Sequence, residues 1–151
     1  MQILEVGDKA PVFSGKDQNG NTVSLAQFTG KKLVLYFYPK DNTPGCTAEA
    51  CNLRDNYDGL LKKGYSIIGV SADSEKSHLN FSDKFNLPFP LITDVDKTII
   101  KSYQAWGEKK MYGKAYEGIL RKTYVISENG VIEKIIEKVI VNDHAKQIFE
   151  E

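Results

Sequence analysis

Hydrophobic positions along the chain follow two different periods. The runs at 33–38 and 65–71 are almost continuously apolar, which is typical of buried strands. Between them, apolar residues recur at helical spacings of four and three positions: Cys46, Ala50, Leu53, Tyr57 and Leu60. This stripe predicts a helix from about 46 to 63 with one face against a core. Gly64, after two lysines, suits its end.

Shorter elements are predicted on both sides of this unit. Asn19-Gly20 suits a hairpin turn between strands at 12–13 and 22–23, and Ser24 would cap a short helical turn. A helix is predicted over 74–85, before two prolines that break it. Its candidate buried residues are Leu79, Phe81 and Phe85.

The last third of the chain alternates short strands with irregular segments. A strand at 91–93 precedes a turn and a short helix over 94–103. Residues 104–118 are polar and basic without a clear period, so we expect a loop. Strands at 123–126 and 131–138 flank a tight-turn signal. A final short helix, capped by Asn142 or Asp143, would extend through Phe149.

This order of elements predicts an α/β protein with a central mixed β-sheet flanked by helices and an N-terminal β-hairpin. It is compatible with a thioredoxin-like fold. The 151 residues fit one domain, 1–151, and we find no internal repeat or linker.

Composition and charge exclude several function classes. Hydrophobic residues make up 41% of the chain, the formal net charge is zero and the pI is near 6.7. A nucleic-acid or membrane-surface binder would usually be basic. The first residues, Met1-Gln2-Ile3-Leu4-Glu5, carry no signal peptide, transit peptide or membrane span, so we expect a cytoplasmic protein. In that compartment a cysteine pair is catalytic or metal-binding rather than a permanent disulfide.

Cys46 is the first candidate for chemistry, because it lies where a buried strand meets a helix N-terminus. Pro39 ends the strand, and Pro44-Gly45 lead into the helix. Unpaired N–H groups and the helix dipole favour an anion at this place. The thiolate, which is the reactive form of cysteine, is therefore favoured at Cys46.

Cys51 lies five residues further along the same predicted helix. It is about 140° round the axis from Cys46, on the wetter flank. The two Cα atoms would be roughly 8–9 Å apart in an ideal helix, whereas a disulfide needs them within about 7 Å. If the two cysteines bond, the first turn of the helix must unwind.

These residues resemble a known family. Pro39-x-x-x-Thr43-x-x-Cys46 is similar to the active-site motif of the peroxiredoxins. The longer string from Tyr36 to Cys51, YFYPKDNTPGCTAEAC, resembles the bacterioferritin-comigratory-protein branch, also called PrxQ. Further similar stretches are 7–13, 106–114 and 118–126, the last of which holds the arginine Arg121. Together they cover nearly the whole chain.

The resemblance implies a thioredoxin-like fold and a thiol peroxidase that reduces hydrogen peroxide and organic hydroperoxides. Cys46 would be the peroxidatic nucleophile, forming a sulfenic acid. Cys51 would resolve it as an intramolecular disulfide, which thioredoxin or a similar dithiol reduces. No metal, haem or flavin is implied. Since both cysteines belong to one chain, a monomer suffices.

Each further site residue has a second interpretation. The hydroxyl of Thr43 would contact the thiolate and the peroxide, or simply cap the helix. The resemblance implies that Arg121 stabilises the thiolate and the leaving oxygen. Taken alone, however, an arginine before a strand usually lies on the surface. Arg54, the other arginine, suits pairing with Asp55 or Asp58.

The loop residues are predicted to bind substrate. Pro39 would shield the thiolate or only end the strand. Pro44 and Gly45 would let the backbone approach the peroxide, with an N–H group at Gly45 alone. Glu49 could orient the loop or interact with the helix dipole.

Other sites and functions stay open as alternatives. Cys-x4-Cys is a poor metal spacing, and His78 and His144 look like surface helix residues. The basic, aromatic segment 104–118 is either a solvated loop or a rim that meets a reductant. Cys51 could be a spare cysteine. A protein thiol–disulfide oxidoreductase and a redox sensor are the rival functions.

Overall fold

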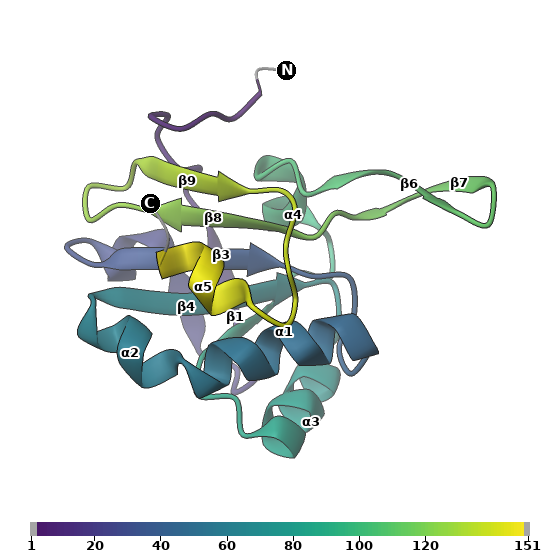
Figure 1. The fold of residues 1–151 in the computed structure, drawn as a ribbon, viewed down its shortest axis with the longest axis horizontal. Coiled ribbons are helices and arrows are strands. Elements are labelled where there is room, and N and C mark those ends of the chain that lie inside the picture. The colour runs from purple at the N-terminus through teal and green to yellow at the C-terminus, as the bar shows by residue number, and fades with distance from the viewer. Residues whose placement is uncertain (1–2, 150–151) are drawn as a thin grey trace.

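The computed structural model describes residues 3–149, which form a central sheet covered on both faces (Figure 1). Its five strands have the order β5-β4-β3-β8-β9. Their bounds are β3 Lys32–Phe37, β4 Tyr65–Ser71, β5 Leu91–Thr93, β8 Lys122–Ile126 and β9 Ile132–Ile136. Strands β3, β4 and β5 are parallel, while β8 pairs antiparallel with both β3 and β9. The predicted mixed sheet is confirmed.

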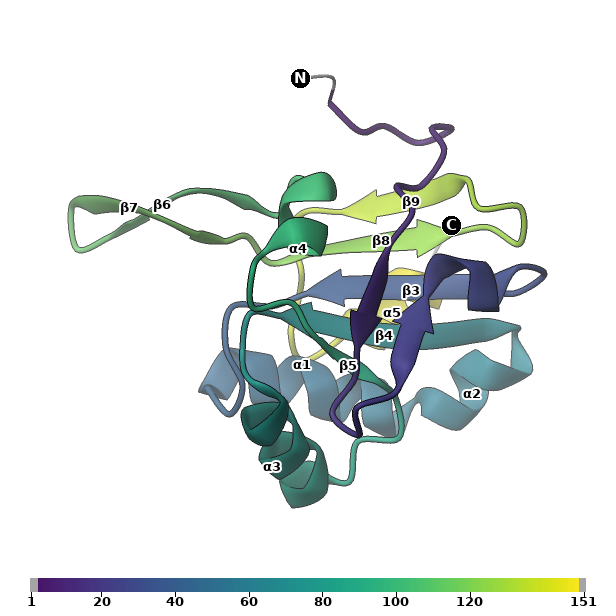
Figure 2. The ribbon, with the colours of Figure 1, turned by 180° about the vertical axis from the view of Figure 1, so that it is seen from behind.

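One face of the sheet is covered by helices. They are α1 Pro44–Asp55, α2 Tyr57–Lys62, α3 Glu75–Phe85 and α5 His144–Phe149. The opposite face, seen in Figure 2, carries the hairpin β1 Ser14–Lys16 and β2 Thr22–Ser24, the 3-10 turn η1 Leu25–Phe28 and helix α4 Thr98–Ser102. No helix in this described part of the chain is long and apolar enough to cross a membrane.

Strand β3 shows why its sequence reads as a continuous apolar run. Leu33, Leu35 and Phe37 pack in the core on the hairpin side. Val34 and Tyr36, with Tyr38 just after the strand, pack in the core under the helices. Because both faces of β3 are buried, hydrophobic and polar residues do not alternate along it.

The long helix predicted over 46–63 is two helices in the structure. The apolar stripe was right: Cys46, Ala50, Leu53 and Leu60 are buried. The chain leaves helical geometry at Asn56, where φ is −107° and ψ is 9°. Its side-chain amide donates to the Asn52 carbonyl at 2.8 Å, a local bond of the kind that competes with regular helix. The helix also begins earlier than predicted, with Thr43 as N-cap and Pro44 as first residue.

The prediction of a loop over 104–118 was wrong. Strands β6 Trp106–Met111 and β7 Lys114–Ile119 form an antiparallel hairpin that projects from the body (Figure 1). Tyr112 and Gly113 make its turn, both with positive φ. Most of β7 is exposed, so no alternation of buried and polar residues marks it as a strand.

Two smaller predictions also need correction. The first strand of the N-terminal hairpin lies at 14–16 rather than 12–13, and Val12 is exposed. On α3, Leu79 is exposed, whereas His78, Phe81 and Ser82 face the interior. Polar side chains thus occupy part of the buried face of α3, which apolar spacing alone cannot show.

Candidate active site

Cys46 lies in the first turn of α1 and is almost completely buried, with 2% of its surface exposed. Strand β3 ends at Phe37, and a short loop leads to the N-cap Thr43. Cys46 is therefore the third residue of the helix, where backbone N–H groups lack intrahelical acceptors. The local geometry favours negative charge on its sulfur.

Arg121 reaches this sulfur from the other end of the sequence. Strand β8 pairs antiparallel with β3, with Lys122 opposite Phe37, so the residue before β8 lies beside the carboxyl end of β3. The Nη2 atom of Arg121 donates to Cys46 Sγ at 3.3 Å. Its Nη1 atom donates to Glu49 Oε1 at 2.7 Å. One guanidinium thus bridges two groups of α1 that are three residues apart.

Gly45 makes this approach possible. A Cβ atom at position 45 would lie 3.2 Å from Arg121 Nη2, closer than most side-chain contacts. Arg121 stays charged in this place. Although burial opposes the charge, the negative charges of Cys46 and Glu49 raise the pKa of Arg121 above its ordinary value.

Glu49 is a member of the site that the sequence left undecided. Its side chain is completely buried, so it does not simply face the helix dipole from solvent. Burial raises the pKa of Glu49 from 4.5 to about 7, and Arg121 offsets only part of this rise. The second oxygen, Oε2, has no hydrogen-bond donor in the described chain. Glu49 thus takes up a proton more readily than an exposed glutamate does.

His144 lies next to Glu49 and is also completely buried, so its prediction as a surface residue was wrong. Its Nδ1 donates to Gln147 Oε1 at 2.8 Å, and Nε2 accepts from the hydroxyl of Thr123 at 2.8 Å. Burial lowers the pKa of His144, with the positive charge of Arg121 adding to the effect. Nε2 lies 3.5 Å from Glu49 Oε2, but in the neutral ring it carries no proton and so donates no hydrogen bond to this oxygen.

Glu49→Gln is expected to change how stability depends on pH. Because the folded-state pKa of Glu49 lies above its ordinary value, proton binding stabilises the fold below pH about 4.5 and this stabilisation is lost as pH rises through about 7. Glutamine stays neutral throughout. As pH rises through this window, the free energy of unfolding of the wild type should therefore fall by up to about 3 kcal/mol relative to that of the variant.

Urea unfolding of the reduced proteins at several pH values measures this difference. Glu128→Gln, which changes an exposed glutamate, is the control and should run parallel to the wild type. A Glu49→Gln profile parallel to the wild type would show that Glu49 is ionised throughout the window.

Thr43 makes a contact that differs from the expected one. Its hydroxyl donates to the Lys40 carbonyl at 2.9 Å and so has no proton left for Cys46 Sγ in this conformation. Its oxygen can still accept a hydrogen bond. Thr43 also caps α1 by its extended backbone, without a side-chain cap bond.

A pocket of ≈ 400 Å³ opens beside Arg121. It is lined by Pro39, Lys109, Leu120, Arg121, Lys122 and Glu137. Lys109, which the sequence placed only within the basic segment 104–118, comes from β6 and donates to the Ile119 carbonyl at 2.9 Å. Burial and the charge of Arg121 lower the pKa of Lys109. Pro39 thus lines this pocket, whereas Pro44 is exposed at the helix start.

Cys51 lies on α1, half-buried, and both cysteines are free thiols. The helix is intact between them, so the spacing argument for unwinding applies to this conformation. Arg54, the competing arginine, pairs with Asp55 at 2.9 Å and donates to the Phe85 carbonyl. It is occupied away from Cys46, as expected.

Comparisons with known proteins show which proteins this chain is similar to. The model of the AhpC/TSA family matches residues 6–135. A putative peroxiredoxin Bcp of Coxiella burnetii is 46% identical over 145 residues, 96% of each chain. Peroxiredoxin Bcp of Bacillus subtilis is 44% identical over 147 residues, covering 97% of this chain and 94% of the relative.

A solved structure is similar over most of its length. It is the bacterioferritin comigratory protein of Xanthomonas campestris, studied for alkyl peroxide reduction in trapped intermediate and ligand complexes. It has a TM-score of 0.84 and 39% identity, covering 90% of this chain and 87% of the other.

Proposed function

This chain belongs to the AhpC/TSA family and is a peroxiredoxin of the Bcp/PrxQ kind, and we propose that its catalytic cycle runs through Cys46 and Cys51. It is a thiol peroxidase with a hydroperoxide substrate and a thiol reductant. The observation that carries the residue assignment is the Arg121 guanidinium, 3.3 Å from a buried sulfur at a helix N-terminus. A protein thiol–disulfide oxidoreductase, which is the rival function, does not need an arginine beside its reactive thiol.

The first step is attack of the Cys46 thiolate on the terminal oxygen of the hydroperoxide. An S–O bond forms, the O–O bond breaks, and the leaving oxygen departs as alkoxide or hydroxide and takes a proton. Arg121 stabilises the thiolate and then the charge on the leaving oxygen, since its donors already point at this place. The products are a Cys46 sulfenic acid and an alcohol or water.

The loop before Cys46 positions the substrate. Pro39 lines the pocket beside Arg121, which supports a role in shielding the thiolate from water. The N–H of Gly45, in the first turn of α1, can donate to a peroxide oxygen. Pro44 sets the start of the helix, and Thr43 can turn its hydroxyl from Lys40 toward the peroxide. The alkyl peroxide reduction activity of the Xanthomonas relative favours alkyl hydroperoxides among the substrates.

The second step joins the two cysteines. The Cys51 thiol attacks the sulfenic sulfur, an S–S bond forms, and the hydroxyl group leaves as water. The first turn of α1 must unwind for this. Thioredoxin or a similar dithiol then reduces the disulfide. The cycle needs one domain and one chain, so we assign a monomer.

Cys51→Ser is expected to lose most turnover when thioredoxin, thioredoxin reductase and NADPH supply electrons. The variant should still consume a stoichiometric amount of peroxide and keep a sulfenic acid that dimedone traps at Cys46. Excess dithiothreitol reduces a sulfenic acid directly, so it should restore turnover and shows that the site is intact. Turnover like the wild type with thioredoxin would place resolution elsewhere.

A further inference from the structure

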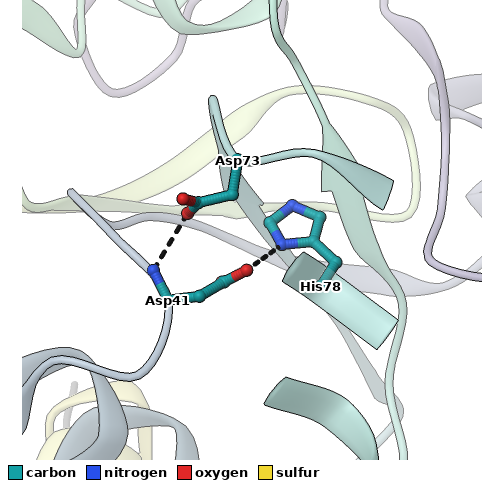
Figure 3. Close-up of side chains that lie close together, drawn as sticks. All are labelled: Asp41, Asp73 and His78. Carbon is teal, nitrogen blue, oxygen red and sulfur yellow. Dashed lines mark hydrogen bonds and ion pairs between the residues drawn. The ribbon is translucent and has the colours of Figure 1, made fainter. Parts of the chain in front are cut away.

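A second buried polar cluster holds the loop in front of Cys46 (Figure 3). Asp41, in this loop, accepts from the Tyr38 hydroxyl at 2.6 Å and from the Ser77 hydroxyl at 2.8 Å. Its Oδ2 lies 2.6 Å from His78 Nδ1. The backbone N–H of Asp41 donates to Asp73 Oδ2 at 2.9 Å. The loop is thus tied to α3 and to the end of β4.

The partners of His78 assign its protons. Nε2 lies 2.9 Å from the Ile92 carbonyl, which can only accept, so Nε2 donates. Nδ1 faces a carboxylate oxygen that also accepts from Ser77, and the short distance fits a charge-assisted bond. His78 is thus held at both ring nitrogens, by Asp41 and by the Ile92 carbonyl, in a place where it is 0% exposed.

The same residues have the composition of a metal site, since ligand atoms of Asp41, Asp73 and His78 lie within 4.8 Å of one another. The carboxylate oxygens of Asp41, however, already accept from Tyr38 and Ser77 and are bonded to His78 Nδ1, so a metal would have to displace these partners. The arrangement serves to fix the loop.

A second anchor lies just beyond Cys51. The side chain of Asn52 donates to the Asn142 carbonyl at 3.0 Å, and its Oδ1 accepts from the Ala145 N–H at 2.8 Å. Asn52 thereby ties α1 to the start of α5. The segment 42–51, which holds both cysteines, lies between the Asp41 anchor and the Asn52 anchor.

We propose that Asp41 and His78 are positioning residues for the peroxide step. They hold the N-terminal end of segment 42–51. After each turnover this segment therefore returns to the helical form that places Cys46 against Arg121. The proposal rests on the two-cysteine cycle above. Loss of the anchor frays the start of α1 and draws Cys46 away from Arg121. Disulfide formation requires this fraying, so it does not depend on the anchor.

The two half-reactions separate this role from a general loss of stability. The rate of peroxide reaction is measured by competition with horseradish peroxidase, and the rate of disulfide formation by alkylation and mass spectrometry after a single peroxide pulse. Asp41→Asn and His78→Leu should slow the peroxide reaction by about tenfold or more. Disulfide formation from the sulfenic acid should be unchanged or faster. His78→Asn, whose amide can donate near the Nδ1 position, should restore part of the first rate.

Asp94→Asn is the matched control, because Asp94 is a buried carboxylate that accepts from the N–H groups of Ile99 and Ile100 at α4 and lies outside the loop. It should leave both rates near the wild type. The proposal would be overturned if Asp41→Asn and His78→Leu reacted with peroxide at the wild-type rate. It would also be overturned if these variants and Asp94→Asn all lost both rates to the same extent. Failure of the wild type to form the disulfide would instead overturn the two-cysteine cycle.

Discussion

Cys46→Ser is expected to abolish hydroperoxide reduction, with a loss of about a thousandfold or more relative to the wild type. A serine hydroxyl stays protonated at neutral pH, so Arg121 and the helix N-terminus have no anion to stabilise. The substitution is nearly isosteric at a side chain that is 2% exposed, so the fold should persist. Peroxide consumption with the thioredoxin system measures the effect.

The control for this loss is Cys51→Ser, which removes the other thiol and should still react stoichiometrically with peroxide. The two variants together separate the attacking cysteine from the resolving one. Peroxide-dependent turnover that persists in Cys46→Ser would contradict the assignment of the nucleophile.

Arg121→Gln is expected to lower the second-order rate constant for reaction with hydroperoxide by about a hundredfold or more, the scale found when a preorganised donor to a transition-state anion is removed. The variant loses both the donor at 3.3 Å from Cys46 Sγ and the positive charge. Arg121→Lys keeps the charge but has no fork to reach Cys46 and Glu49 together, so it should fall in between.

Arg54→Gln is the matched control for Arg121, since Arg54 pairs with Asp55 on α1 and does not contact Cys46. It should react with peroxide like the wild type. Arg121→Gln also leaves Glu49 buried without its partner, so the double variant with Glu49→Gln is needed. If Arg121 acted only by pairing with Glu49, the double variant would recover the rate of reaction with hydroperoxide. We expect this rate to stay low.

Several features of the fold could be predicted because burial leaves a direct trace in the sequence. The runs at 33–38 and 65–71 are strands with both faces covered, and the stripe from Cys46 to Leu60 is the buried face of α1 and α2. The break at Asn56 could not be predicted, since it depends on a side-chain bond to one carbonyl. The β6–β7 hairpin has too few buried residues to show a period.

The candidate site was predicted through its motif rather than through its three-dimensional geometry. Cys46 at a helix start follows from the local sequence, but Arg121 depends on the antiparallel register of β3 with β8, which spacing does not reveal. Glu49, His78 and His144 were missed as buried residues for one physical reason. A polar residue that pairs with another polar residue in the interior has the same sequence pattern as one that faces water.

The central claim is that Cys46 and Cys51 form a disulfide during turnover and that the first turn of α1 unwinds to allow it. The most direct measurement is peptide mapping of the wild-type protein after treatment with one equivalent of peroxide and alkylation of free thiols. The account predicts a single intramolecular Cys46–Cys51 linkage that thioredoxin removes. Two alkylated thiols, or a disulfide between two chains, in protein that still turns over peroxide would contradict it.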